Sequence, residues 1–166
     1  IFYRTDTRVN LLSQTLNLIK NEVASENPSG EITSEIWSQM VANVEILGTS
    51  PDAQIPGLEG PRAKCCRQGI HAADTVLVPL EDGDRCEALI QMGKQVLVVD
   101  LNPLSRTART ANVTIVDNVS RAFDEMVKIA LEKPAYPDIT WDNRAALIDA
   151  IETMGKAAAR SFDQGD

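Results

Sequence analysis

The sequence predicts an α/β fold with a mainly parallel sheet, and three apolar runs carry this prediction. Continuous runs of aliphatic, β-branched residues lie at Thr75–Pro79, Gln95–Val99 and Val113–Val116. Such runs are typical of strands that are buried on both faces of a parallel sheet. A helix-like pattern separates the first two runs. Strand, helix and strand in this order predict right-handed crossovers, and therefore parallel neighbours.

The segments before these runs are less regular. Apolar residues recur at steps of three and four from Val9 to Val23, which predicts an amphipathic helix that ends at the turn-forming residues 25–30. A short helix over Ser34–Met40 and a short strand over Val44–Leu47 are expected next. Residues 49–69 contain several Pro and Gly residues without a clear period, so we expect an irregular loop there.

Further helices are predicted between and after the strands. The pattern from Cys86 to Met92 predicts a helix, and Gly93 stands where a C′ glycine is common. Apolar positions from Val119 to Ala130 predict another helix. Residues 133–137 are expected to form a linker, and a last amphipathic helix is expected to begin near Asp142.

Composition excludes several classes of function. The net charge of −8 and the aromatic share of 4% argue against nucleic-acid binding, which needs positive charge and stacking platforms. No apolar run is long enough for a membrane span, and no signal peptide is visible. Three cysteines without metal-site spacing predict reduced thiols in a reducing cytoplasm.

The first candidate site is the acidic turn Glu81–Arg85, which follows the first predicted strand. In open α/β sheets, ligands bind outside the carboxyl ends of the strands. Asp84 and Glu87 have capping-box spacing, so the turn could simply be a well-capped helix start. The same helix N-terminus offers N–H groups to an anion, and Gly83 allows a ligand to approach closely. Asp82 and Asp84 could hold a hard cation such as Mg²⁺.

The second candidate site is Asp100–Thr110, which follows the second predicted strand. The strand-terminal Asp100 could accept hydrogen bonds from ribose hydroxyl groups. Arg106 and Arg109 offer planar forks to phosphate or carboxylate groups, and Arg106 has no obvious structural partner in the sequence. The alternative is a solvated crossover loop, but the density of polar side chains at a strand end favours function. Neutral donors accompany the arginines: Ser105, Thr107 and Thr110.

Other chemical signals are weak. The single histidine, His71, precedes a predicted strand and is more typical of a packing residue than of a catalyst. Trp37 and Trp141 are expected in a core or an interface. The chain has no Walker A motif, no glycine fingerprint after a strand, and no hydrolase or zinc-protease motif.

Longer motifs point to one family. The chain contains PGLE and PRAK within residues 56–64, VPLEDGDR at 78–85, DLNPLSRTA at 100–108 and IVD at 115–117. In this combination the sequence resembles the archaeal 4-phosphopantoate–β-alanine ligases, also called phosphopantothenate synthetases. The resemblance runs from the first residue to about Leu131.

The resemblance implies a Rossmann-like, open and mainly parallel sheet with helices on both faces, in a homodimer. It implies an enzyme of coenzyme A biosynthesis that joins 4-phosphopantoate to β-alanine through an acyl-adenylate, with 4′-phosphopantothenate, AMP and pyrophosphate as products. ATP and Mg²⁺ are the implied cofactors, and no nucleic-acid or membrane partner is expected.

Combined with the two candidate sites, the resemblance assigns catalytic roles to Asp84 and Arg106 and places Mg²⁺ at Asp82 and Asp84. A wider set of residues is expected to bind the nucleotide: Asp82, Gly83, Asp84, Arg85, Asp100, Leu101, Asn102, Ser105, Arg106 and Thr107.

The chain begins with an apolar residue rather than Met, and Arg4-Thr5 resembles the family's strand-to-helix junction. We therefore expect further family sequence upstream. Residues 1–133 are expected to form the ligase domain, and residues 134–166 a linker and a C-terminal helix that packs on it. Two alternatives stay open: a non-catalytic nucleotide-binding or scaffold domain, and a different Rossmann-like enzyme that uses a dinucleotide. The missing glycine fingerprint counts against the second.

Overall fold

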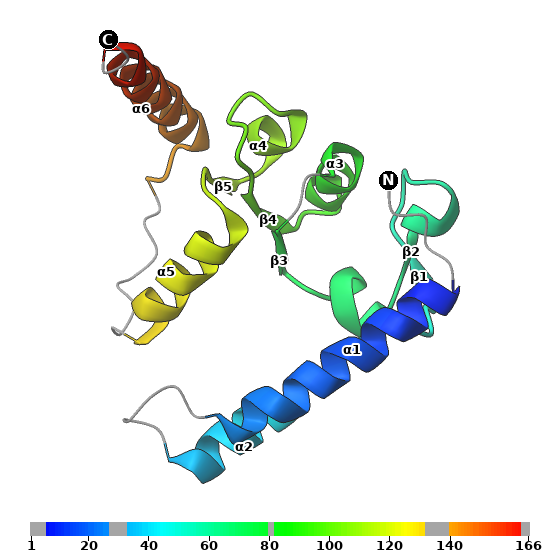
Figure 1. Ribbon diagram of the computed structural model, residues 1–166. Coiled ribbons are helices and arrows are strands. Elements are labelled where there is room, and N and C mark those ends of the chain that lie inside the picture. Colours follow the sequence, from blue (N-terminus) through cyan, green and yellow to red (C-terminus); the bar gives the residue numbers. More distant parts are fainter. Residues whose placement is uncertain (1–5, 27–32, 80–81, 132–139, 164–166) are drawn as a thin grey trace. The chain divides into compact units, whose positions relative to one another are not determined.

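The computed structural model describes residues 6–26, 33–79, 82–131 and 140–163 (Figure 1). Within it the chain divides into two units, Ile1–Ala72 and Ala73–Asp166. The predicted linker over residues 133–137 lies outside the described residues, as does most of the predicted turn over residues 25–30.

Unit 1 begins with two helices that pack on each other, α1 (Asp6–Ser25) and α2 (Ser34–Ala42). Both confirm the sequence prediction. Trp37 Nε1 and Ser38 Oγ of α2 donate to the carbonyl groups of Val23 and Ala24 at the end of α1. Lys20 of α1 donates in return to the carbonyl of Ala42, at the end of α2. Each helix therefore supplies partners for the unsatisfied C-terminal carbonyl groups of the other.

The rest of unit 1 differs from the prediction. Residues 44–47 form no strand, because no described segment pairs with them. The expected irregular loop instead contains an antiparallel pair, β1 (Ala53–Gln54) and β2 (Lys64–Cys65), with Ile55 and Ala63 buried beside it. Two short helical segments flank β2: η1 (Gly60–Arg62) and η2 (Arg67–His71).

Unit 2 contains a parallel three-stranded sheet in the order β3-β4-β5. Its strands are β3 (Thr75–Val78), β4 (Gln95–Val99) and β5 (Val113–Ile115), close to the three predicted runs. Val76 of β3 pairs with Val96 of β4. The coarse prediction, an α/β fold with a parallel sheet, is confirmed.

Burial distinguishes the central strand from its neighbours. Val96, Val98 and Val99 of β4 are buried, as predicted. β3 is not buried on both faces, since Leu77 is 37% exposed and Val76 and Val78 are only half-buried. This prediction is wrong because the described residues pair β3 with β4 alone. An apolar run therefore identifies a strand without fixing its place in the sheet.

Two helices make the crossovers of the sheet, and they pack against each other (Figure 1). They are α3 (Gly83–Gln91) and α4 (Arg106–Thr110). Cys86 and Leu89 of α3 and Ala108 of α4 are completely buried. Gly93 follows α3 with φ +79°, and its N–H donates to the Ile90 carbonyl. The predicted C′ glycine is therefore confirmed.

Two longer helices complete unit 2: α5 (Val119–Leu131) and α6 (Asn143–Asp163). Both were predicted, and Asp142 caps α6 by accepting hydrogen bonds from the N–H groups of Arg144 and Ala145. α6 packs on α4 and β5. Among the described residues, no helix combines the length and apolar character that a bilayer crossing requires. Cys65, Cys66 and Cys86 form no disulfide among the described residues.

Candidate functional site

The N-terminus of α3 is built by Asp82. Its backbone is non-helical, with φ −153° and ψ 83°, and its Oδ1 accepts a hydrogen bond from the Arg85 N–H at 3.2 Å. A side chain in this position satisfies one of the free N–H groups of the first helical turn, so Asp82 is the N-cap. The capping box predicted for Asp84 and Glu87 is wrong, because the helix begins at Gly83 and Asp84 already lies in its first turn.

Arg106 connects the two candidate sites. Its Nη2 lies 2.8 Å from Asp84 Oδ1 and 2.7 Å from Glu87 Oε2, so one guanidinium nitrogen on α4 contacts two carboxylates on α3. A Cβ atom added at Gly83 would lie 3.4 Å from Cγ and Cδ of Arg106. The space beside Gly83 is therefore occupied by the stem of Arg106. The expectation that Arg106 lacks a structural partner is wrong, because its partners come from another helix.

The charges of this cluster nearly balance. The hydrogen bond to Glu87, followed by the charge of Asp84, raises the pKa of Arg106 above its ordinary value. Asp82, Asp84 and Glu87 contribute three negative charges, and Arg85 and Arg106 contribute two positive charges. The side chains of Arg106, Asp84 and Glu87 are about half exposed, at 54%, 48% and 48%. A ligand from solvent can therefore compete for the guanidinium.

The turn between β4 and α4 is held by its own side chains. Asp100 Oδ1 accepts from the Asn102 N–H at 2.9 Å, and Asp100 Oδ2 accepts from the Ser105 hydroxyl. The same Ser105 oxygen accepts from the Ala108 N–H at 2.9 Å and so caps α4. Asn102 Oδ1 accepts from the Leu104 N–H at 3.0 Å. Side chains of this kind stabilise turns by replacing backbone partners.

This turn changes the roles expected for its residues. Asp100, Asn102 and Ser105 were predicted to contact a nucleotide, but their side-chain oxygens are engaged within the turn, and Asp100 and Ser105 are buried. Leu101 and Leu104, by contrast, are each more than 60% exposed. The turn therefore has a rigid polar interior and an apolar outer surface. Side-chain contacts with a ligand would fall to the exposed residues, and the buried ones fix the backbone.

Replacing Ser105 with alanine is expected to destabilise unit 2. The change removes the cap of α4 and leaves the buried Asp100 carboxylate without one of its donors. Loss of a cap and of a buried charged partner should together lower the free energy of unfolding by about 2–4 kcal/mol. Urea denaturation measures the change. Thr110→Ala is the matched control, because it removes an exposed hydroxyl bond on the same helix and should cost at most about 1 kcal/mol. Equal losses would contradict the role given to Ser105.

A family model matches almost all of this chain. It describes phosphopantothenate/pantothenate synthetases, and the match covers residues 1–159. The chain belongs to this family. The match extends through most of α6, well beyond Leu131, where the resemblance in the sequence analysis ended.

Curated relatives carry the same family identity. The chain is 47% identical over 172 residues to 4-phosphopantoate–β-alanine ligase of Thermococcus kodakarensis, covering 99% of this chain and 58% of that protein. It is 43% identical to the ligase of Thermococcus onnurineus, covering 92% and 48%, and 42% identical to that of Methanosarcina mazei, covering 93% and 54%. The chain therefore spans about half the length of the curated relatives it matches.

On α4, one buried side-chain oxygen has no hydrogen-bond partner among the described residues. Thr107 is 1% exposed, and its Oγ1 has no hydrogen-bond partner among the described residues. Its carbonyl accepts a weak bond from the Cys86 thiol at 3.9 Å. Burial, followed by the charges of Asp82 and Glu87, raises the pKa of Cys86 to about 11. A raised pKa favours the protonated thiol at neutral pH, and a buried, protonated thiol is a poor nucleophile.

The carboxylates available for a metal are few. Within the described ranges, no group of three or more His, Cys, Asp or Glu side chains is arranged to hold a metal ion. Mg²⁺ differs from most metals in that it is commonly held by one or two carboxylates together with substrate phosphates and waters. Asp82 and Asp84, the two carboxylates predicted to hold Mg²⁺, are the N-cap residue of α3 and a residue of its first turn.

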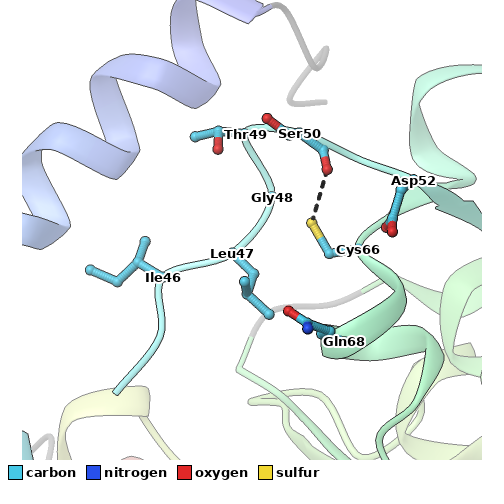
Figure 2. A pocket seen from close by; sticks show the side chains of 8 residues that line it. All are labelled: Ile46, Leu47, Gly48, Thr49, Ser50, Asp52, Cys66 and Gln68. Atoms are coloured by element: carbon cyan, nitrogen blue, oxygen red, sulfur yellow. Dashed lines mark hydrogen bonds between the residues drawn. The ribbon is translucent and has the colours of Figure 1, made fainter. Parts of the chain in front are cut away.

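Unit 1 contains a small hollow (Figure 2). Its volume is about 160 Å³, whereas ligand pockets usually enclose about 300–1,000 Å³. Cys66 donates across it to the Ser50 carbonyl at 3.6 Å. The hollow is too small for a nucleotide. None of the predicted site residues lines it: the lining residues are Ile46, Leu47, Gly48, Thr49, Ser50, Asp52, Cys66 and Gln68.

Sequence reasoning missed two residues of this region. Glu87 was read only as a capping residue, yet it is one of the two partners of Arg106. Its position three residues after Asp84 places both carboxylates on one face of the helix, and this spacing was an available signal. Asn143 also binds α4, from a distance of 35 residues in the sequence. No local sequence pattern predicts such a contact.

Proposed function

We propose that the protein to which this chain belongs is an ATP-dependent ligase that joins 4-phosphopantoate to β-alanine. The observation that carries the proposal is the contact of Arg106 with Asp84 and Glu87, which brings the VPLEDGDR and DLNPLSRTA motifs together at one edge of the sheet. The names of the curated relatives support the same activity.

The proposed reaction has two steps. In the first, the carboxylate of 4-phosphopantoate attacks the α-phosphorus of ATP, an acyl-adenylate forms and pyrophosphate leaves. In the second, the amine of β-alanine attacks the acyl carbon, AMP leaves and a proton is released as the amide forms. No side-chain nucleophile is needed, which agrees with the protonated Cys86 thiol. Catalysis then rests on positioning and on stabilising negative charge.

Arg106 is proposed to bind phosphate oxygens in this reaction. Its guanidinium is half exposed and is held beside the N-terminus of α3 by Asp84 and Glu87. A planar fork can engage two phosphate oxygens at once. Because the guanidinium is already oriented, little side-chain freedom is lost when the nucleotide arrives. A phosphate would replace or share the carboxylate partners, which lie on the exposed side of the cluster.

Asp82 and Asp84 would hold Mg²⁺ in this proposal. The cluster at the start of α3 has one more negative than positive charge, so phosphate groups are repelled unless a cation accompanies them. When bound, Mg²⁺ would neutralise phosphate charge near the reacting phosphorus. Asp84 would then alternate between Arg106 and the metal, and Asp82 would combine this role with capping.

The remaining assignments complete the proposal. The backbone of the Asp100–Asn102 turn, the exposed Leu101 and the first turn of α3 from Gly83 to Arg85 are proposed to surround the nucleotide. Thr107, which was predicted to bind the nucleotide, is 1% exposed and would support the site from within. A homodimer in the cytoplasm, a full Rossmann-like sheet with helices on both faces, and a ligase domain over residues 1–133 followed by a linker and helix are parts of the same proposal.

The complete protein is expected to turn over ATP to AMP and pyrophosphate only when 4-phosphopantoate and β-alanine are both present, because 4-phosphopantoate starts the reaction and β-alanine releases AMP and frees the enzyme. Chromatographic measurement of AMP, with each substrate omitted in turn, tests this. Formation of ADP and phosphate instead would contradict the acyl-adenylate mechanism. ATP binding without any turnover would favour a nucleotide-binding or scaffold role instead.

A further inference from the structure

Asn143, the first residue of α6, binds three backbone groups of the nucleotide-site scaffold. Its Nδ2 donates to the carbonyl of Ala108 at 2.9 Å and to the carbonyl of Ala111 at 3.0 Å. Its Oδ1 accepts from the Thr114 N–H at 2.7 Å. Both amide hydrogens and the carbonyl oxygen of the side chain are therefore used, and the side chain is half-buried.

The bonds to Ala108 and Ala111 lie at the C-terminal end of α4, which is only five residues long, and the bond to Thr114 joins Asn143 to β5. A helix this short has few internal hydrogen bonds, so side chains from outside decide where it sits. Ser105 holds its N-terminus, and Asn143 with Thr114 Oγ1 holds its C-terminal carbonyl groups. Arg106 and Thr107 lie between these two anchors.

α6 packs on the rest of unit 2 mainly through its first turn. Asp142 caps the helix and so fixes the position of Asn143. Leu147, one turn further along, is buried, whereas Ile148, Ile151 and Met154 are each more than one third exposed. The first turn of α6 therefore holds α4, and most of the remaining helix is exposed.

We propose that Asn143 is a positioning residue for nucleotide binding, which acts by holding the helix that carries Arg106 and Thr107. The inference rests on the proposed function, because it assumes that Arg106 meets ATP. Asparagine suits the task. A carboxylate in its place would turn an oxygen toward two carbonyl oxygens, and a glutamine would be one methylene too long for the same three contacts.

Asn143→Ala in the complete protein is expected to raise the KM for ATP by about threefold to tenfold, the range of one neutral hydrogen bond. The KM for β-alanine should change little. Asn143→Asp should raise the KM for ATP at least as far, since it lacks both donors and turns an oxygen toward the two carbonyl groups. Thr114→Val removes only the hydroxyl bond to Ala108 and should give a smaller rise in the same direction.

Asn112→Ala is the matched control. Asn112 is also half-buried, but its Oδ1 accepts from a strand N–H, that of Val96 at 2.8 Å, rather than from a group of α4. Its loss should lower the Tm without raising the KM for ATP. In a double-mutant cycle, Asn143→Ala should have a smaller effect when Arg106 is already alanine, because the two residues act through one helix.

An unchanged KM for ATP in folded Asn143→Ala would overturn the inference, as would additive effects with Arg106→Ala or an equal rise in Asn112→Ala. If Asn143→Ala does not fold, an unchanged KM in Thr114→Val overturns it. The Kd for ATP, measured by calorimetry on each variant, separates the two proposals. A wild-type protein that binds ATP but makes no AMP would contradict the ligase proposal. The role of Asn143 would then be tested by the Kd for ATP alone. A wild-type protein that does not bind ATP would contradict both proposals.

Discussion

Arg106→Ala in the complete protein is expected to lower kcat/KM by at least tenfold while the protein stays folded. The guanidinium lies at the surface with two exposed carboxylate partners, and exposed ion pairs contribute little to stability. Its proposed contact with a phosphate is made where water is partly displaced. Loss of a hydrogen bond to such a charged group corresponds to roughly tenfold to a hundredfold in rate. Steady-state kinetics measure the loss, and circular dichroism verifies the fold.

Arg106→Lys should recover only part of the lost activity. A lysine ammonium can approach Asp84 or Glu87, but it is a point charge and cannot bind two phosphate oxygens as a planar fork does. Near-native kcat/KM in the alanine variant would remove Arg106 from the site. Full recovery with lysine would show that only charge is required.

Asp84→Asn is expected to reduce activity by about an order of magnitude or more, as expected for a carboxylate that helps to hold Mg²⁺-ATP. The change should cost little stability, because Asp82 rather than Asp84 caps α3. The KM for Mg²⁺ should rise with the loss of one carboxylate ligand. Kinetics at varied Mg²⁺ concentration, with thermal unfolding as the folding control, measure both effects.

Glu87→Gln separates the two ways in which Asp84 could act. Glu87 contacts the same Arg106 nitrogen, 2.7 Å away, but is not proposed to bind the metal. If Asp84 acts through the metal, only Asp84→Asn should raise the KM for Mg²⁺. Matching losses in the two variants, with no change in Mg²⁺ dependence, would mean that both carboxylates merely orient Arg106.

The fold was predictable from the sequence where a pattern is local. The periods of α1, α3, α5 and α6 and the apolar runs of β3, β4 and β5 each describe one element. The errors concern relations between elements. Val44–Leu47 has the residues of a strand but no partner among the described residues, and Leu77 is partly exposed because β3 has a neighbour on one side only. Residue type alone does not determine pairing.

The site was predictable at the level of residue types and strand ends, but not of contacts. Asp82, Asp84 and Arg106 lie at the carboxyl edge of the sheet, where the sequence placed them. That Ser105 and Asp100 bond each other, and that Arg106 reaches Glu87 across 19 residues, follow from the packing of α3 on α4. The spacing of residues within one helix or turn gives no information on how two helices pack on each other.

The hydrogen bonds that hold the two ends of α4 close loops of different lengths. Ser105 closes loops of three and five residues with Ala108 and Asp100, whereas Asn143 closes loops of 29, 32 and 35 residues. The entropy lost on closure grows with the logarithm of loop length. During synthesis the Ser105 bonds can form as soon as residue 108 has emerged, whereas the bonds from Asn143 must wait for α6. We therefore expect the two sets of bonds to form at different stages of folding.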